Sequence, residues 1–529
     1  MTLTAVGGHW DAEVLVVGGG HNGMIAAAYL ARAGVDVLVL EARSSVGGCA
    51  STVEDLGARF NICHCTHTLV RALPLEEELD LADHGLNYLS SDADSVFAFH
   101  DDRDPWVLFH DVERTLCGLA ATHSASVDSY RRYLDDALPV ARLLIDVLRT
   151  PPTAPRLALT AARRRLEGVG RLLSWSRLSA AELLARWFDD WRMTMPAVSI
   201  GPTVWGVPPE THGTGLAALT YAIRHLVRTG RPAGGSGALV DAIRSSFEAA
   251  GGMVRCDARV ATLVVDSDRV DGVRLVDGTR LRAPVVVAAC DPAAVLTEWL
   301  EGEPPESLRL LADRYRAQQR PQGYESKVDA VMEGVPVPRA ADALRSALSD
   351  FDPVGHTTVV SPDPSDLAEA HLRWADGRVA DRPTLLVDVP SMVDPSMVPA
   401  PGRHILSLEV LFTPYGLPGG WSASSEPERW LGIWADRMEP GALQLLLDWR
   451  VMTPDRYQQE FFLDKGYSPT WSGSPLRAFV GQPPETTRYR TPLSGLYLTG
   501  AGTYPGAGIV GASGRNAARV VLDELRSFQ

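Results

Sequence analysis

Apolar residues near the N-terminus form two short runs that flank a stretch of helix-favouring residues. Residues 13–17 (EVLVV) are mostly apolar and lead into three glycines. The alanine-rich stretch 24–33 predicts a helix that Gly34 ends. Residues 35–40 (VDVLVL) predict a second strand, because parallel strands buried on both faces read as apolar runs. The pattern therefore predicts a strand–helix–strand unit.

Apolar runs and helix-favouring stretches alternate again later in the chain. The predicted elements are a helix at 238–250, strands at 259–265, 270–276 and 285–289, a last strand at 495–499 and a terminal helix at 514–525. Asp277-Gly278 is a tight-turn signal after one of these strands. Together with the N-terminal unit, they predict an α/β fold with a Rossmann-type domain, a mixed α+β second domain and a helical insertion.

The helical insertion is predicted between residues 115 and 230. Within it, residues 142–186 hold nine Arg against Asp146, Glu167 and Glu182, and their apolar residues recur at helical spacing. Two interpretations stay open. One is a solvated helical subdomain with Arg-rich faces, and the other is a basic amphipathic surface that rests on anionic lipid at the membrane or gates an apolar substrate.

The composition narrows the class of protein. Of the 529 residues, 45% are hydrophobic and 22% charged, which argues for a large core and against wholesale disorder. The formal net charge of −15 argues against a nucleic-acid partner. No run of about 18 apolar residues occurs, so no membrane span is expected. The six cysteines form no CxxC pair, which favours a cytoplasmic location and argues against a disulfide reductase.

The strongest motif is GGGHNG at 18–23, a GxGxxG sequence between the first predicted strand and the helix. Gly18 permits a tight turn, Gly20 lets the backbone approach a pyrophosphate, and Gly23 lets the helix pack close to the strand. The free N–H groups and the dipole of the helix N-terminus favour phosphate. Glu41, at the end of the second strand, can accept a hydrogen bond from a ribose hydroxyl. The motif predicts a dinucleotide site.

Two further glycine-containing segments indicate which dinucleotide binds. RSSVGG at 43–48 resembles the extended FAD fingerprint of the glutathione-reductase-type flavoproteins. GAGTYPGAGIVGASG at 500–514 follows a predicted strand and precedes a helix, so its side-chain-poor backbone suits contact with the flavin end of FAD. We therefore predict FAD as the cofactor.

Four segments resemble the phytoene-desaturase-like flavoproteins, a group of carotenoid desaturases, carotenoid isomerases and related flavin oxidoreductases akin to the amine oxidases. They are VVGGGHNGMIAAAYLARAGVDVLVLEARSSVGG at 16–48, GGSGALVDAI at 234–243, VVVAACDP at 285–292 and LYLTGAGTYPGAGIVGASGRNAARVVL at 496–522. The resemblance is weak over 95–230 and 300–480, where substrate choice would lie. It implies the fold and FAD, and leaves the substrate open.

The motifs and the resemblance together predict a division of the chain and a set of FAD contacts. The FAD-binding domain comprises 12–90, 234–300 and 481–529, and the substrate domain comprises 91–233, with the Arg-rich insertion, and 301–480. The residues predicted to bind FAD are Gly18, Gly20, His21, Asn22, Gly23, Glu41, Ala42, Arg43, Gly47, Gly48, Val260, Gly500, Ala501, Gly508, Ile509 and Val510.

Two residues are predicted to act near the flavin. His64 has an ordinary pKa near neutrality and suits proton transfer or substrate contact, with a structural histidine as the alternative. Lys327 lies on a strand-like stretch where amine-oxidase relatives often place a Lys that reaches flavin N5 through water; an ordinary exposed Lys is the alternative. The cysteines and histidines between Cys63 and His67 lack a second ligand pair, so no metal is predicted.

The predicted activity is an FAD-dependent dehydrogenase or oxidase that accepts a hydride from an apolar or secondary-metabolite substrate, with C–C desaturation as the first choice and reoxidation by oxygen or a quinone. An amine oxidase and a redox-neutral isomerase are the alternatives. An aromatic cage or an acid that pairs with a cationic amine would favour amine oxidation, whereas a wide tunnel under the Arg-rich helices would favour desaturation. Candidate tunnel walls, with burial in the core as the alternative, are Trp191, Trp205, Tyr221, Trp421 and Trp471.

Overall fold

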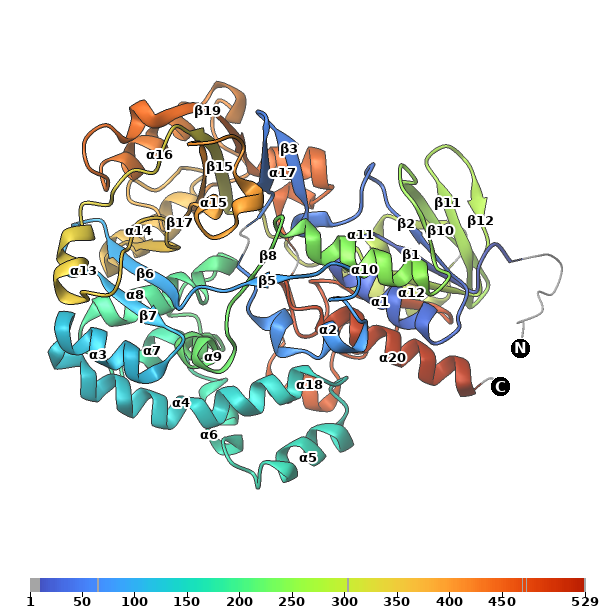
Figure 1. The fold of residues 1–529 in the computed structure, drawn as a ribbon. Coiled ribbons are helices and arrows are strands. Elements are labelled where there is room, and N and C mark those ends of the chain that lie inside the picture. Colours follow the sequence, from blue (N-terminus) through green and yellow to red (C-terminus); the bar gives the residue numbers. More distant parts are fainter. Residues whose placement is uncertain (1–9, 64–65, 302–303, 469, 472, 528–529) are drawn as a thin grey trace.

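The computed structural model describes residues 10–63, 66–301, 304–468, 470–471 and 473–527. Two large sheets occupy different halves of the molecule in Figure 1. A group of helices lies below one of them.

The first large sheet is parallel and has the strand order β20-β13-β1-β2-β9. Its strands and the helices on one of its faces are β1 (Val14–Val17), β2 (Val37–Leu40), β9 (Met253–Arg255), β13 (Val285–Ala288), β20 (Leu496–Leu498), α1 (His21–Arg32), α10 (Gly237–Ala249) and α20 (Ala512–Ser527). β1 is completely buried and pairs with both β2 and β13. α1 packs against α10 and α20, so the start, middle and end of the chain share one core.

The opposite face of the parallel sheet packs against a smaller sheet and two helices. These elements are β10 (Val260–Asp266), β11 (Arg269–Leu275), β12 (Arg280–Leu281), β14 (Leu300–Glu301), α11 (Pro292–Thr297) and α12 (Glu306–Arg316). Leu15 and Val17 of β1 point into this second core, whereas Val14 and Val16 point toward α1. The alternation of strand side chains thus explains why every residue of β1 is apolar.

The second large sheet has seven strands in the order β19-β15-β18-β17-β16-β6-β7. Its strands are β6 (Ala93–Phe99), β7 (Trp106–Phe109), β15 (Glu325–Met332), β16 (Thr358–Ser361), β17 (Leu385–Asp388), β18 (His404–Leu411) and β19 (Leu446–Met452). All neighbours are antiparallel except β6 and β16. The sheet therefore joins segments from both predicted parts of the substrate domain.

The two faces of this sheet differ in character. Val328 and Ala330 of β15 pack with Trp430 and Trp434 of α16 (Glu426–Ala435) in an apolar core. The residues that alternate with these two along β15 face the other way and include charged groups. The charged groups lie against the hairpin formed by β3 (Thr52–Asp55) and β4 (Ala58–Asn61). Strand alternation therefore separates an apolar face from a polar one.

Helices cover the β6, β7 and β16 end of the polar face with an apolar, aromatic-rich core. They are α3 (Val112–Thr122), α4 (Val127–Leu148), α6 (Val169–Trp175), α7 (Ala180–Leu184), α8 (Trp191–Ser199) and α9 (Thr220–Leu226). The helix α5 (Ala154–Arg163) follows α4 and buries none of its residues. The structure confirms the predicted α/β fold with a mixed second part and a helical insertion, while the exact division into domains stays a prediction. None of the helices in the described part of the chain combines the length and apolar composition needed to cross a membrane.

Asp94 on β6 ties the seven-stranded sheet to the helical layer. Its fully buried carboxylate forms an ion pair with Arg224 of α9 and accepts a hydrogen bond from Thr229. We predict that Asp94→Asn lowers the free energy of unfolding by about 3 kcal/mol, because removing one partner leaves a charge buried without compensation. Thermal and urea unfolding of the two proteins measure the loss.

The matched control is Asp376→Asn, which removes an exposed ion pair with Arg378 at 3.0 Å. That variant should change the free energy of unfolding by less than about 0.5 kcal/mol. Equal losses in the two variants would show that the Asp94–Arg224 ion pair does not stabilise the contact between the sheet and α9.

Candidate active site

The GGGHNG segment forms a tight turn between β1 and α1. Gly18 has φ = +100°, a conformation that favours glycine, and its N–H donates to the Leu40 carbonyl over 2.8 Å. A Cβ at Gly23 would lie 2.0 Å from the Gly18 carbonyl oxygen. Position 23 therefore admits no side chain, and this close approach brings the helix N-terminus directly to the end of the strand.

Gly20 has the surroundings expected of a phosphate cradle. It directly precedes α1, and no side chain caps the helix there. A Cβ at Gly20 would meet no atom within 4 Å, so the space beside it is open. Gly47 borders this turn and donates its N–H to the Gly19 carbonyl over 2.9 Å. Open space at an uncapped helix N-terminus fits the pyrophosphate of FAD.

Glu41 is buried at the end of β2, where it fixes the glycine turn. Its Oε2 accepts from the Gly19 N–H over 2.7 Å, and its Oε1 accepts from the Arg43 N–H over 2.8 Å. A carboxylate oxygen has more than one lone pair. Glu41 therefore can hold the turn and still accept a hydrogen bond from a ribose hydroxyl.

The other contacts predicted near Glu41 lie along the same segment. The N–H of Ala258 donates to the Glu41 carbonyl over 2.8 Å, so the chain that leads into β10 runs beside residues 41–43, Ala42 included. Val260 is buried at the start of β10. The Arg43 guanidinium lies 4.1 Å from the centre of the Phe461 ring and is thereby directed toward α17 (Pro454–Phe461).

The C-terminal loop closes against the N-terminal motif. The Gly514 N–H donates to Asn22 Oδ1 over 3.3 Å, across 492 residues of sequence. The His21 imidazole hydrogen-bonds to the backbone of Gly508, and burial lowers the pKa of His21 to about 4, so the ring is neutral at pH 7. The two ends of the chain therefore build one site.

Hydroxyl groups fix the backbone of the C-terminal loop. Ser513 Oγ accepts from the Gly500 N–H over 2.9 Å and hydrogen-bonds to the hydroxyls of Thr499 and Thr503 at 2.8 and 2.6 Å. Ile509 and Val510 join the core that surrounds α1. The loop is thus anchored at both ends, with its glycines between them.

Two of the predicted tunnel aromatics lie against this loop. A Cβ at Gly508 would come within 3.4 Å of the Trp205 ring, and the backbone N–H of Trp471 donates to the Ala501 carbonyl over 3.1 Å. The other three are Tyr221 and Trp421, which are buried in the core, and Trp191, which packs edge-on against Phe99.

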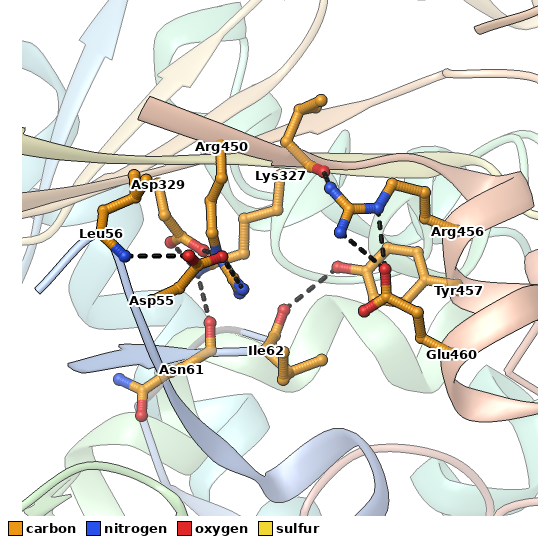
Figure 2. Close-up of polar contacts among 11 residues, drawn as sticks. Asp55, Leu56, Asn61, Ile62, Lys327, Asp329, Arg450, Arg456, Tyr457 and Glu460 are labelled. Atoms are coloured by element: carbon orange, nitrogen blue, oxygen red, sulfur yellow. Dashed lines mark hydrogen bonds and ion pairs between the residues drawn. The ribbon is translucent and has the colours of Figure 1, made fainter. Parts of the chain in front are cut away.

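Lys327 is buried, which removes the alternative of an ordinary exposed lysine. Its ammonium donates to the Asn61 carbonyl over 2.6 Å and forms an ion pair with Asp329. Asp329 also pairs with Arg450 over 3.2 Å, and Arg450 pairs with Asp55 over 3.3 Å (Figure 2). Two cations and two carboxylates therefore balance one another between β15, β19 and the β3–β4 hairpin. His64, the other predicted catalytic residue, lies outside the described residues.

Two acids beside Lys327 were missed by the sequence analysis. Glu409 of β18 lies directly opposite Lys327, and Glu325 precedes Lys327 by two positions, so all three side chains share one face of the sheet. Burial raises the pKa of Glu409 to about 7. Burial and the charge of Glu409 raise the pKa of Glu325 well above its usual range.

The arrangement of the two carboxyl groups requires a proton. Glu409 Oε2 is buried, and within the described residues no N–H or hydroxyl donates to it. The carboxyl groups of Glu325 and Glu409 hydrogen-bond to each other. One shared proton avoids two negative charges side by side.

Two cysteines connect the carboxyl pair to the cofactor segment, residues 43–48, which is predicted to pass beside FAD. Cys49 directly follows Gly47-Gly48, and its thiol hydrogen-bonds to that of Cys63, just beyond β4. The pKa of the Cys63 thiol is raised by this hydrogen bond first, then by burial and by the nearby charges of Cys49, Glu325 and Glu409. The carboxyl pair thus lies near the segment predicted to pass beside FAD. The absence of a CxxC sequence gave no sign that these two free thiols meet.

Gly20→Ala tests whether the cradle binds FAD. Its Cβ meets no protein atom, so the variant should keep its Tm without cofactor. The same methyl group enters the space predicted for the pyrophosphate and should weaken FAD binding at least about tenfold. Flavin absorbance at about 450 nm per chain and the Kd of the apoprotein for FAD measure the effect.

Gly170→Ala, within α6, is the control for this change, because a Cβ there also meets no atom within 4 Å. It should bind FAD like the unmodified protein. If both variants bind FAD equally well, the cradle has been assigned to the wrong place.

The sequence matches a family model described as flavin containing amine oxidoreductase over residues 23–319. Among similar proteins, the rat "pyridine nucleotide-disulfide oxidoreductase domain-containing protein 2" is 28% identical over 98% of this chain and 94% of its own. The "phytoene desaturase (neurosporene-forming)" of Rhodobacter capsulatus is 25% identical over 97% of this chain and 94% of its own.

A solved structure has the same fold along nearly the whole chain. Cyclohexylamine oxidase from Brevibacterium oxydans IH-35A superimposes with a TM-score of 0.58 and 17% identity, covering 98% of this chain and 100% of that one. These comparisons confirm the predicted fold, the resemblance to the phytoene-desaturase-like proteins and the FAD cofactor. The chain belongs to the flavin containing amine oxidoreductase family and is an FAD-dependent oxidoreductase.

Proposed function

We propose that this protein is an FAD-dependent dehydrogenase that converts a C–C bond of an apolar or secondary-metabolite substrate into C=C. The observation that carries the proposal is the Glu325–Glu409 carboxyl pair next to Lys327. Desaturation removes a hydride from one carbon and a proton from its neighbour, so it needs a base as well as a hydride acceptor. The pair supplies such a base near the cofactor segment.

Bound FAD supplies the two-electron acceptor for the hydride. Glu409 takes up the proton that leaves the neighbouring carbon as the double bond forms. A pKa of about 7 suits a general base at neutral pH. Lys327, directly opposite on β15, stabilises the ionised form of Glu409. The two electrons then leave the protein on oxygen or a quinone.

Two neutral aromatic groups in the surroundings of the pair favour a substrate without charge. Tyr324 and Tyr457 are buried, and the charges of Glu325 and Glu409 reach both. Burial raises the pKa of each phenol well above its usual range, so both rings stay neutral. Neutral aromatic rings around a single base are suited to an apolar molecule. The similarity to a phytoene desaturase over nearly the whole chain supports the same choice.

Amine oxidation is the second candidate. A carboxyl pair that shares one proton keeps one negative charge, and two tyrosine rings lie beside it. A negative charge among aromatic rings is also a site for an ammonium group. In this alternative the pair binds the substrate and does not act as its base. The pair would then control KM, whereas in desaturation it controls kcat.

Glu409→Gln tests the base. With an apolar substrate, kcat should fall about a hundredfold or more, because no carboxylate remains to take the proton. The unmodified enzyme should gain activity as the pH rises through about 7, and the variant should lose this rise. Turnover in the presence of oxygen or a quinone gives kcat, and anaerobic mixing with saturated hydrocarbons, terpenoids and amines gives the rate of flavin reduction from bleaching at about 450 nm.

Glu333→Gln, an exposed acid just beyond β15, is the control and should leave kcat unchanged. If amines are the substrates, Glu409→Gln should mainly raise KM for cationic amines and spare kcat. An unchanged kcat and an unchanged pH profile with an apolar substrate would remove Glu409 as the base.

The raised pKa of Glu409 also predicts a stability profile that needs no substrate. An acid whose pKa is raised by folding contributes its stability below the ordinary value of 4.5 and loses it as the pH rises through about 7. The Gln variant should lack this part of the pH dependence of Tm.

Lys327→Met tests reoxidation. A buried ammonium near the flavin favours electron transfer to oxygen, because it stabilises the negative charge that develops. Reoxidation of the reduced enzyme by oxygen should slow about tenfold in the variant, while Asp329 stays paired with Arg450 at 3.2 Å. Stopped-flow absorbance measures the rate, with exposed Lys465→Met as the control. Unchanged reoxidation and turnover would exclude Lys327 from the reaction.

A further inference from the structure

Large apolar side chains gather on one exposed part of the molecule. Fourteen such side chains lie exposed in the described part of the chain, and six of them belong to three neighbouring segments. These six are Leu159, Leu166 and Leu173 of the α5–α6 region and Leu476, Phe479 and Val480 of α18 (Pro475–Val480). Single exposed apolar residues are ordinary, but a cluster indicates a contact surface.

The three helices form one surface although α18 is distant in sequence. α18 packs against both α5 and α6. α5 buries none of its own residues and lies beyond α4 at the lower edge of Figure 1. We call α5, α6 and α18, with the turn between α5 and α6, the basal surface. Its six exposed apolar side chains therefore lie outside the protein's own core.

The basal surface is also strongly basic. Its arginines are Arg156, Arg163, Arg164, Arg165, Arg171 and Arg477, and Glu167 is the acid within the same segments. Acids on packed elements pair with three of the arginines: Asp523 with Arg156, Asp146 with Arg164, and Asp136 with Arg171. Arg163 and Arg165, both exposed, have no ion pair within the described residues. Positive charge is thus concentrated here on an otherwise acidic protein.

A basic hollow borders this surface. It has a volume of about 450 Å³, and its lining includes Arg164, which follows α5. The other charged lining residues are Arg71, Arg142, Arg149, Arg228 and Asp146. Five guanidinium groups against one carboxylate suit a phosphate group, because guanidinium donors match phosphate oxygens in geometry and charge.

We propose that the basal surface docks the enzyme onto a membrane that contains anionic phospholipid. The exposed leucines and Phe479 would enter the boundary between headgroups and acyl chains, and the arginines would contact the lipid phosphates. Charge complementarity selects this occupant, since a purely apolar partner would leave Arg163 and Arg165 without anions. The interpretation of residues 142–186 as a merely solvated subdomain does not account for the clustered apolar side chains.

Vesicle flotation of the FAD-loaded, full-length protein tests the proposal. The protein should float with vesicles made of equal parts phosphatidylcholine and phosphatidylglycerol, and should not float with phosphatidylcholine alone. The variant Leu159→Gln/Leu166→Gln/Phe479→Gln should lower the partition coefficient at least about tenfold. Arg163→Gln/Arg165→Gln should lower it about thirtyfold and weaken its dependence on salt.

The control variant carries Leu310→Gln/Leu372→Gln/Leu443→Gln, three leucines that are exposed to a similar degree elsewhere on the protein. It should float like the unmodified protein, and all variants should retain their FAD and Tm. Equal loss of flotation in the control and basal variants would overturn the proposal. It would also be overturned by a dimer that the basal variants alone dissociate in light scattering, with no flotation of the unmodified protein.

Discussion

The structure depends on the closure of both ends of the chain around the N-terminus of α1. Gly23 can carry no side chain because Gly18 lies against it. The C-terminal loop is joined to the same turn through Asn22 and Gly514. A cofactor bound there contacts backbone that is fixed from both directions, so little entropy remains to be lost on binding. The central position of β1 follows from the same closure, since its neighbours come from the middle of the chain as well as from the start.

Strand alternation gives β15 one apolar face and one charged face. Val328 and Ala330 face an apolar core with α16, whereas Lys327 and Glu325 face the opposite side. The charged residues are therefore held on a rigid strand that the apolar core secures. Lys327 is neutralised by Asp329, so the carboxyl pair beside it holds the unbalanced charge of this region. A buried charge of this kind is typical of a group that exchanges protons.

The helical insertion adds a different kind of surface to this framework. Its inner side packs aromatic rings against β6 and β7 and forms a dense core. Its outer side, α5 above all, contributes nothing to that core. The two sides differ because α4 is long and half-buried, whereas the proline-bounded segment that follows it is short and projects outward. Substitutions on the outer side of the insertion can therefore change its surface without changing the core on its inner side.

The sequence by itself determined the features that depend on local spacing. Gly18, Gly20 and Gly23 lie within one turn, and Glu41 follows at the end of the next strand, so the tight turn between β1 and α1 could be predicted from the order of residues. Tertiary structure alone decided the meeting of Glu325 with Glu409 and of Cys49 with Cys63, because these residues lie on separate segments with no periodicity in common. It also decided that Lys327 is buried in an ion pair and that α18 extends the surface of α5. Contacts between distant segments depend on strand register and helix packing, which a linear pattern of residues does not contain.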